Sequence, residues 1–390
     1  MKICHIITRL VVGGAQENTI FTVEGLIKKG YKVDLITGKT KGPEGTLEKK
    51  VQQKGIPLII VKELVRNINP FYDIIAFVKL FFIFRKNKYD IVHTHSAKAG
   101  ILGRISAKLA YSSTIVIHTI HGLPFHQYQN KILNFIYIVA EKIAYYFTDH
   151  FICVGEVMKE KSIKAGIGNE DDYTVIYSGF EVEKYINTCF EKREILREKY
   201  GIRKDEKVIG MIGRLFYLKG HNFLLEAFRD ISKKYPDVKL LLVGDGILRE
   251  QLENYAKKHG IYDKIIFTGL ISPEKIPEHV AIMDILVHTS LREGLPKSVA
   301  QGLAGGKPVV AFDIDGTKEV VINGKTGFIV PPGNVKVLKE KIIYLLENFE
   351  IASKMGIEGQ NLIKKLFPVE KMVDEIEKIY LKFLSNGKKS

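Results

Sequence analysis

The sequence predicts an α/β protein built from two doubly wound parallel β-sheets. Short apolar runs rich in valine and isoleucine alternate with longer segments of helical spacing along most of its 390 residues. This alternation is typical of parallel sheets covered by helices on both faces. It stops over residues 178–206, which are highly charged, and then restarts. We therefore expect two sheets joined by a hinge with at most one short helix, and a ligand cleft between the carboxyl ends of their strands.

The expected elements follow in chain order. Seven strands of the first sheet are expected at residues 2–8, 32–37, 57–61, 90–94, 114–119, 150–154 and 173–176. Six strands of the second are expected at residues 208–212, 239–243, 264–268, 284–288, 308–312 and 327–330. The chain after Pro332 is expected to be helical, and residues 369–384 place an apolar stripe on one helix face. The expected domains are 1–180, 181–366 and a final helix, 367–390.

Composition narrows the class of protein. The hydrophobic content of 46% is enough for two cores. Cys4, Cys153 and Cys189 are scattered, which favours unpaired thiols in a reducing compartment, with Cys4 and Cys153 buried in their strands. The first ten residues do not resemble a signal peptide, and no apolar run of about 18 residues is present. We expect a cytoplasmic protein without a transmembrane helix.

Charge is unevenly distributed. Residues 1–131 hold 20 Lys and Arg against 8 Asp and Glu, within a total net charge of +15. This predicts an anionic partner, either a membrane surface or a lipid diphosphate, and an ordinary lysine-rich surface is an equally good interpretation. No nucleic-acid module is recognisable, so no nucleic-acid partner is expected. Segments 71–84 and 132–147 could lie on a membrane, although burial against a sheet is the favoured interpretation of both.

The most informative segment is 284–332. Its first apolar run ends at a polar loop that carries Glu293, Gly294, Leu295 and Pro296. Pro296 suits the first turn of a helix, whose amino end attracts phosphate. Glu293 is too close to that end to be a phosphate ligand itself, and a carboxylate suits hydroxyl groups better. A carboxylate for hydroxyls beside helix dipoles for phosphate indicates a sugar nucleotide.

Further residues suited to a phosphate ligand follow other strands. Gly213-Arg214 and Lys219-Gly220 bracket a loop after one strand, and a fork-shaped guanidinium with a mobile ammonium suits a diphosphate. Two solvated cations would be the ordinary alternative. Gly13-Gly14 follows the first strand and would let backbone approach a ligand, although a simple turn is as good an explanation.

Two patterns resemble metal sites. His93 and His95 form a His-x-His pair on a strand, but no third ligand stands at a suitable spacing, so a metal is not expected. Asp313 and Asp315 form a DxD pattern in a loop, interpreted as a loop feature without metal. No GxGxxG motif is present, which argues against a nicotinamide oxidoreductase.

Taken together, these motifs resemble the retaining glycosyltransferases of family 4, which have the GT-B fold of two Rossmann-like domains. The family pattern is Glu-Gly-x-x followed by a second Glu eight positions after the first, and here these positions are Glu293 and Gln301. The resemblance implies a retaining, metal-independent sugar transfer from a nucleotide diphosphate, UDP being the expected nucleotide, with no cofactor. It also implies a final helix that crosses back to the first domain, and domain closure over the substrates.

The resemblance also assigns roles to residues. Those expected to carry catalysis are His121, Arg214, Lys219 and Glu293, with His121 holding the donor sugar. Those expected to bind the donor are Gly13, Gly14, Gly213, Arg214, Lys219, Gly269, Leu270, Glu293, Gly294, Leu295, Pro296 and Gln301. Those expected on the acceptor side are His93, His95, Lys98, Phe125 and His126. His118, inside its strand, is expected to be packed.

The expected acceptor is a glycan or a polyprenyl-diphosphate-linked sugar of cell-surface polysaccharide synthesis. Gln301 keeps an acceptor oxygen for a ribose hydroxyl but loses the charge of the usual glutamate, so altered nucleotide binding is expected. Two alternatives stay open. One is a sugar-nucleotide 2-epimerase, which would need a second carboxylate in the first domain, and the other is a non-catalytic sugar-nucleotide-binding subunit.

Overall fold

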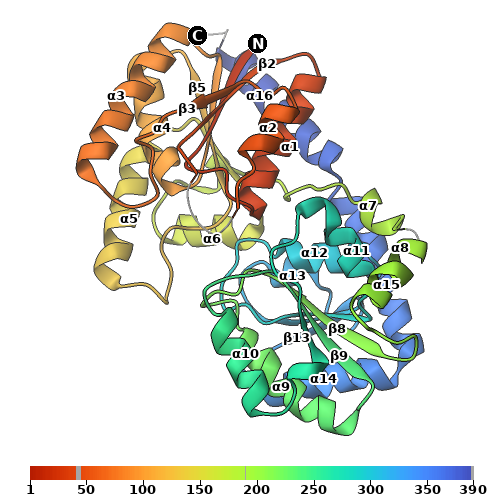
Figure 1. Ribbon diagram of the computed structural model, residues 1–390. Helices are drawn as coiled ribbons and strands as arrows, with labels where there is room; N and C mark the ends of the chain where they lie inside the picture. Colours follow the sequence, from red (N-terminus) through yellow and green to blue (C-terminus); the bar gives the residue numbers. More distant parts are fainter. Residues whose placement is uncertain (41–44, 189, 388–390) are drawn as a thin grey trace. The chain divides into compact units, whose positions relative to one another are not determined.

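The computed structural model describes residues 1–40, 45–188 and 190–387. Contacts between Cα atoms divide the chain into two compact units (Figure 1). Unit 1 comprises residues 1–180 and 369–390, and unit 2 comprises residues 181–368. Each unit is built around one parallel sheet and is described by itself.

The sheet of unit 1 has seven parallel strands in the order β3-β2-β1-β4-β5-β6-β7. The strands are β1 (Lys2–Ile7), β2 (Lys32–Thr37), β3 (Leu58–Ile60), β4 (Ile91–His95), β5 (Ile115–Ile120), β6 (His150–Cys153) and β7 (Tyr173–Val175). The helices are α1 (Gly14–Lys28), α2 (Glu48–Gln53), α3 (Pro70–Asn87), α4 (Ala97–Ala110), α5 (Lys131–Tyr145), α6 (Glu156–Lys164) and α16 (Val369–Gly387), with a 3-10 turn η1 (Glu170–Asp172). All seven expected strands are confirmed to within one residue at each end.

Alternation of side chains gives this sheet two buried faces. Ile3 and Ile7 of β1 pack in a cluster with side chains of α1 and α16, whereas Cys4 and Ile6 pack in a cluster with side chains of α3 and α4. The apolar stripe of the final helix is confirmed. Its residues in the first cluster are Val369, Met372, Val373, Ile376, Ile379, Tyr380 and Phe383.

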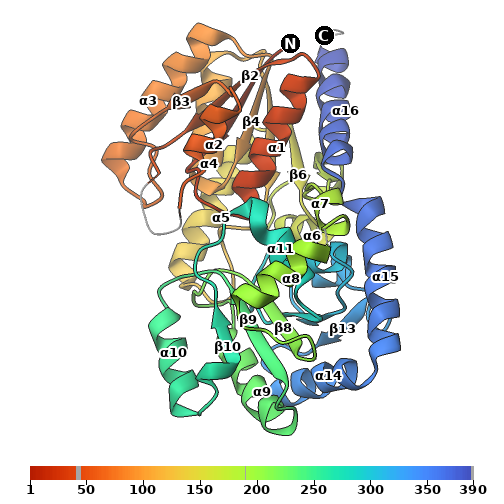
Figure 2. The same cartoon turned by 45° about the vertical axis from the view of Figure 1, so that its right-hand side comes forward.

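The final helix therefore belongs to unit 1, as expected from the resemblance. α16 lies against α1 (Figure 2). At the edge of this contact, Glu377 accepts hydrogen bonds from Lys29 Nζ at 2.7 Å and from the Tyr31 hydroxyl at 2.6 Å. The last helix thus completes a core that the first strand begins.

The sheet of unit 2 has six parallel strands in the order β10-β9-β8-β11-β12-β13. The strands are β8 (Lys207–Ile212), β9 (Val238–Val243), β10 (Ile265–Phe267), β11 (Ile285–His288), β12 (Val309–Phe312) and β13 (Gly327–Val330). The helices are α7 (Glu183–Ile186), α8 (Phe190–Lys199), α9 (His221–Lys234), α10 (Arg249–Lys258), α11 (Ile276–Ala281), α12 (Lys297–Ala304), α13 (Thr317–Val320), α14 (Val335–Glu347) and α15 (Phe349–Leu366), with 3-10 turns η2 (Tyr262–Lys264) and η3 (Pro273–Lys275).

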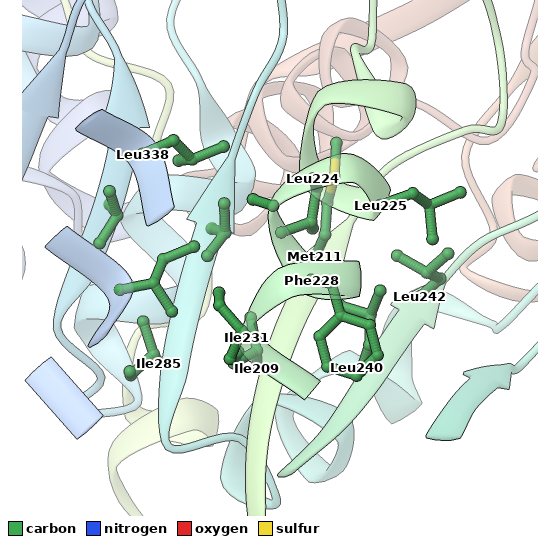
Figure 3. Packing of buried hydrophobic residues seen from close by; sticks show 14 of the residues in the cluster. Ile209, Met211, Leu224, Leu225, Phe228, Ile231, Leu240, Leu242, Ile285 and Leu338 are labelled. Atoms are coloured by element: carbon green, nitrogen blue, oxygen red, sulfur yellow. The ribbon is translucent and has the colours of Figure 1, made fainter. Parts of the chain in front are cut away.

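The core of unit 2 lies between its sheet and the helices α9 and α14. Leu224 and Phe228 of α9 pack beside Ile209 of β8 and Leu240 of β9, with Leu338 of α14 in the same cluster (Figure 3). This packing fixes α9, and with it the loop between β8 and α9 that carries the predicted cations.

The expected hinge is wrong in one respect, because it forms two helices, α7 and α8, rather than at most one. The charged composition of this segment gave no indication of the few residues that hold it in place. Tyr185 and Leu196 are buried, and the Arg197 guanidinium donates to the carbonyls of Arg203 at 2.5 Å and Glu206 at 2.8 Å. The segment therefore packs as part of unit 2.

Helix α5 is also not the buried helix that the sequence favoured. Only Glu141 and Ala144 of this helix are buried. An exposed apolar row, here called the α5 stripe, runs along the helix and its C-cap. It consists of Ile132, Phe135, Ile136, Val139, Ile143 and Tyr146. Helix α3 buries Ala76, Leu80 and Phe84, while Phe71, Ile74 and Phe82 stay exposed.

The cysteine prediction is confirmed for Cys4 and Cys153, which are buried and form no disulfide within the described residues, and Cys189 lies outside those residues. Among the described residues, no helix combines the length and apolar character needed to cross a membrane.

Candidate functional site

Two loops at the carboxyl edge of the second sheet are locked together. Gly220 begins α9 in a left-handed conformation with φ of 71°, and a Cβ there would lie 2.0 Å from the Thr289 carbonyl oxygen. The Thr289 hydroxyl donates to the Gly220 carbonyl at 2.9 Å. Only glycine fits this approach without strain. The loop with Lys219 is therefore held against the start of the loop with Glu293.

Lys219 and Glu293 form an ion pair across these loops. Glu293 Oε1 accepts from Lys219 Nζ and lies 3.6 Å from Nε2 of the buried His288. Burial would raise the pKa of Glu293, but Lys219 and His288 outweigh it and lower that pKa below its ordinary value. Burial also lowers the pKa of His288 to about 4. At neutral pH the site therefore holds the Glu293 carboxylate beside a neutral His288 imidazole.

The backbone at Glu293 is fixed by the loop after β12. Glu293 N donates to Asp315 Oδ2 at 2.7 Å, and Asp315 adopts a φ of 38° that non-glycine residues rarely adopt. Asp313 pairs instead with Lys318 at 2.9 Å. The two aspartates of the DxD pattern thus serve separate contacts, and Asp315 positions Glu293.

Helix α12 begins one residue later than expected. Pro296 is its N-cap with φ of −75° and ψ of 89°, and Lys297 is the first helical residue. The extended ψ value places Pro296 outside the first turn. Ser298, in that turn, has its hydroxyl 3.3 Å from His288 Nδ1. The amino end of α12 thus lies beside the imidazole that faces Glu293.

Gln301 lies inside α12 rather than at its exposed end. Its side chain is 9% exposed, and Nε2 donates to the Tyr185 hydroxyl of α7 at 2.6 Å. Gln301 therefore ties α12 to α7, and its predicted contact with a ribose stays a prediction.

We expect Gln301→Glu to keep its activity within about three-fold of the unchanged enzyme, because a carboxylate can accept a hydrogen bond from the Tyr185 hydroxyl. Steady-state kinetics with the donor measure this effect. Gln301→Leu, which can form no such bond, is the matched control and should be less stable by about 1 kcal/mol. Loss of activity in Gln301→Glu with its stability intact would contradict the expectation.

The other predicted donor residues border the same sheet edge. Arg214 is exposed, with its guanidinium 5.1 Å from the centre of the Phe216 ring. Gly213 follows β8, and its carbonyl lies 2.2 Å from where a Cβ of Gly244 would stand. The remaining residues, with their positions, are Gly269 (φ of 73°, after β10), Leu270 (exposed), and Gly294 and Leu295 (half-buried, before α12).

In unit 1, the predicted histidines lie within β4 and β5 or directly after β5. His93 and His95 are buried, and both ring nitrogens of each are hydrogen-bonded within the protein. Their acceptor-side role stays a prediction, but they do not offer exposed contacts. His121 is half-buried, with Nε2 3.0 Å from His95 Nδ1. His118 is packed inside β5, as expected.

The remaining residues predicted in unit 1 are held by their own neighbours. Lys98 Nζ donates to Asp73 Oδ1 at 2.6 Å and to the Asn67 carbonyl. The backbone of His126 bonds with the Asn134 side chain, and Phe125 packs against the Leu123 cluster. Gly13 is the N-cap of α1, with an extended φ of 178° that any residue can adopt, and Gly14 is the first helical residue.

The sequence argument against a metal rested on a missing third ligand, and the structure supplies one. His5 of β1 joins His93 and His95, with one ligand atom from each within 4.8 Å of the others. An ion there would have to displace bonds that occupy both nitrogens of all three rings. The expected absence of a metal stays a prediction, now resting on this satisfied hydrogen bonding.

Comparison with known proteins settles the family. A family model described as Glycosyltransferase Family 4 matches residues 12–184, and one described as Glycosyl transferases group 1 matches residues 192–362. An uncharacterised glycosyltransferase of Methanocaldococcus jannaschii is 32% identical over 78% of this chain and 78% of its own. The chain belongs to the family 4 glycosyltransferases.

Two further relatives match this glycosyltransferase along most of its length. The UDP-Gal:α-D-GlcNAc-diphosphoundecaprenol α-1,3-galactosyltransferase of Escherichia coli is 29% identical, covering 99% of this chain and 98% of its own. The capsular polysaccharide biosynthesis glycosyltransferase CapM of Staphylococcus aureus is 28% identical and covers 94% of both chains.

Solved structures confirm the fold of this glycosyltransferase. HepE of Anabaena, in complex with UDP and glucose, aligns with a TM-score of 0.84 and 22% identity over 98% of this chain and 100% of its own. A glycosyltransferase of Rickettsia africae aligns with a TM-score of 0.80 and 25% identity over 99% of both. The predicted GT-B class, with two Rossmann-like domains, is confirmed.

Sequence reasoning missed three residues at or beside the loop that carries Glu293. They are His288, Asp315 in its role toward Glu293, and Arg292, whose pKa is lowered by burial and raised by Asp315 and Glu293, with burial prevailing. His288 is the last residue of β11, so its place at a carboxyl strand end was an available signal.

Proposed function

We propose that this glycosyltransferase moves a hexose from a UDP-sugar to a hydroxyl of a polyprenyl-diphosphate-linked sugar or glycan, with retention at the anomeric carbon and without a metal. The setting would be cell-surface polysaccharide synthesis. The full-length match to the E. coli relative, whose name specifies UDP-Gal and a diphosphoundecaprenol-linked sugar, supports both substrate classes. HepE, which was crystallised with UDP and glucose, supports the nucleotide.

The structural observation that carries this proposal is the Lys219–Glu293 pair beside the start of α12. Transfer breaks the bond between the anomeric carbon and a diphosphate oxygen and forms one from that carbon to the acceptor oxygen, whose proton passes to the departing diphosphate. Negative charge collects on that diphosphate as the first bond breaks. Lys219, Arg214 and the first N–H groups of α12 would stabilise this charge. Glu293 would accept hydrogen bonds from sugar hydroxyls, and His121 would contribute one more bond to the sugar.

A screen of UDP-, GDP- and ADP-sugars without added metal tests the proposal. We expect a UDP-sugar to raise the melting temperature and to be hydrolysed slowly to UDP. With a diphosphate-linked sugar as acceptor, NMR of the product should show the anomeric configuration of the donor. Release of an isomerised sugar nucleotide would indicate an epimerase. Binding without hydrolysis or transfer would indicate a non-catalytic sugar-nucleotide-binding subunit, and absence of binding to all of them would refute the proposal.

We also infer that the α5 stripe rests on an anionic membrane, where a polyprenyl-linked acceptor would be held. Ile132 is 71% and Phe135 is 67% exposed, and the exposed Lys131 and Lys142 flank the row. The one acidic residue of α5, Glu141, is buried against Arg104. An apolar row with cations and without exposed acids suits the interface of an anionic bilayer.

Replacing Phe135 and Ile136 by aspartate should weaken binding to vesicles containing phosphatidylglycerol by about 30-fold, because two apolar side chains would no longer leave water. Cosedimentation measures the binding. Ile357→Asp, in α15 of unit 2 and 59% exposed in the unchanged protein, is the matched control and should bind as before. Unchanged vesicle binding by the double variant would overturn the inference. It would also be overturned if the two substitutions abolished a dimer of this protein instead of its binding to vesicles.

A further inference from the structure

A continuous chain of hydrogen bonds runs through the interior of unit 1 and ends at His121. Its links, in order, are Thr119 Oγ1 to His93 Nε2 (2.6 Å), His93 Nδ1 to the Tyr380 hydroxyl (2.5 Å), that hydroxyl to His5 Nε2 (3.2 Å), His5 Nδ1 to His95 Nε2 (2.9 Å) and His95 Nδ1 to His121 Nε2 (3.0 Å). The chain joins β1, β4 and β5 to the last helix. His5, His93 and His95 each use opposite ring nitrogens for their two links, and His121 ends the chain through Nε2.

The environment keeps these imidazoles neutral. His5, His93 and His95 are buried, and burial lowers the pKa of His5 to about 3 and that of His121 to about 4. Burial also lowers the pKa values of His93 and His95. A neutral imidazole has one N–H and one lone pair, so it can donate on one side only.

This rule couples the four rings. Each link needs one proton, so a ring that donates through Nδ1 forces the next to do the same. If Tyr380 donates to His5, then His5, His95, His121 and also His93 all carry the proton on Nδ1. If Tyr380 donates to His93, all four carry it on Nε2. Mixed tautomers would leave one link without a proton or with two.

Thr119, at the far end of the hydrogen-bond chain, determines which of the two tautomeric states is favoured. Thr119 is buried, and the described part of the chain offers its hydroxyl no hydrogen-bond partner besides His93. With the rings in the Nε2–H state, His93 would donate to Thr119 and leave that hydroxyl hydrogen unpaired, which is costly in the interior. In the Nδ1–H state Thr119 donates to His93, and every donor in the chain finds an acceptor.

We propose that Tyr380, His5, His93 and His95 are positioning residues that hold His121 in the Nδ1–H tautomer, so that its outward nitrogen donates to a sugar hydroxyl oxygen. The assignment of the sugar to His121 rests on the proposed function, whereas the shared tautomer does not. Tyr380 of α16 thereby sets the hydrogen-bond polarity of His121, which follows β5.

Two-bond ¹H–¹⁵N correlation spectra of protein labelled with ¹⁵N-histidine test the chain directly. We expect His5, His93, His95 and His121 all to be neutral and Nδ1–H. A mixture of tautomers among the four, a shared Nε2–H state, or a stoichiometric metal retained by the purified protein would overturn the proposal. This readout needs no substrate, so it stands apart from the proposed function.

Tyr380→Phe removes the one link between His93 and His5. His93 is then uncoupled from the other three rings, while His5, His95 and His121 lose their directing donor and become mixed. The KM for the donor should rise about three-fold with kcat nearly unchanged, because only part of the population presents the right tautomer.

Thr94→Val is the matched control. It removes a hydroxyl bonded at 2.8 Å to His118, a buried imidazole on the other face of the sheet. It should lower the melting temperature as Tyr380→Phe does and leave the four tautomers and KM unchanged. Equal changes of KM in both variants would show a merely structural role. If no sugar nucleotide binds even the unchanged protein, the proposed function fails. The spectra would still show whether the four histidines share the Nδ1–H tautomer.

Discussion

Lys219→Met is expected to lower kcat by about 100- to 1,000-fold, the usual cost of removing one group that stabilises charge in a transition state. Lys219 is the cation that the structure holds against Glu293 at the edge of the second sheet. Its loss would leave the departing diphosphate with less compensation. Glu293→Gln should cause a loss of similar size, since it both frees Lys219 and weakens the contact with sugar hydroxyls. Single-turnover kinetics with a saturating donor measure both.

The pair should also behave as a unit. The variant with both changes should be little slower than the slower single variant, because each residue acts through the other. Lys234→Met is the control. Lys234 lies at the far end of α9 and pairs with Glu347 at 3.0 Å, so its loss removes the same charge away from the site. A Lys219→Met enzyme as fast as this control would refute the assignment.

Arg104→Met is expected to destabilise unit 1 by about 3–5 kcal/mol, because it strands a buried carboxylate. Arg104 is fully buried in α4 and donates to Glu141 of α5 at 2.5 Å. It also donates to the Gly100 carbonyl at 3.0 Å. Urea unfolding followed by circular dichroism measures the loss of stability.

Arg104→Met combined with Glu141→Leu tests the reason for that loss. With both charges replaced by apolar groups, stability should return to within about 1 kcal/mol of the unchanged protein. If the double variant is as unstable as Arg104→Met, packing rather than the stranded charge is responsible. Glu141 anchors α5 from its buried side. Arg104→Met should therefore also weaken the binding of the α5 stripe to vesicles.

Most of the fold could be predicted because strand burial leaves a local signal. Most strands of the two sheets are short apolar runs rich in valine, isoleucine or leucine, which can be recognised without knowledge of the neighbouring strands. The α7–α8 segment could not be read this way, because it is held by contacts with residues far along the chain: the Tyr185 hydroxyl accepts from Gln301 of α12, and the Arg197 guanidinium donates to the Ile282 carbonyl. The predicted burial of α5 was wrong for the opposite reason. Its apolar residues give a clear local signal, but those of the α5 stripe are exposed.

The site was predictable only where a motif carried it. Glu293 and Lys219 stand in recognisable patterns, but their ion pair joins residues far apart in sequence and appears only in the fold. His5 gives no local signal, because it reads as one more residue of an apolar strand. Its partnership with His95 depends on the register that places β1 beside β4.

Unit 1 is built from two segments that are far apart in the sequence, and this has a consequence for biosynthesis. Met372, Val373 and Ile376 of α16 fill a core whose other members lie before residue 180. During translation, unit 2 is therefore complete before the first unit receives its last helix. Chains that stall before residue 369 would expose the apolar face of β1 and α1 to chaperones or aggregation. Only chains that include α16 can bury that face, so synthesis as far as α16 is a condition for a stable unit 1.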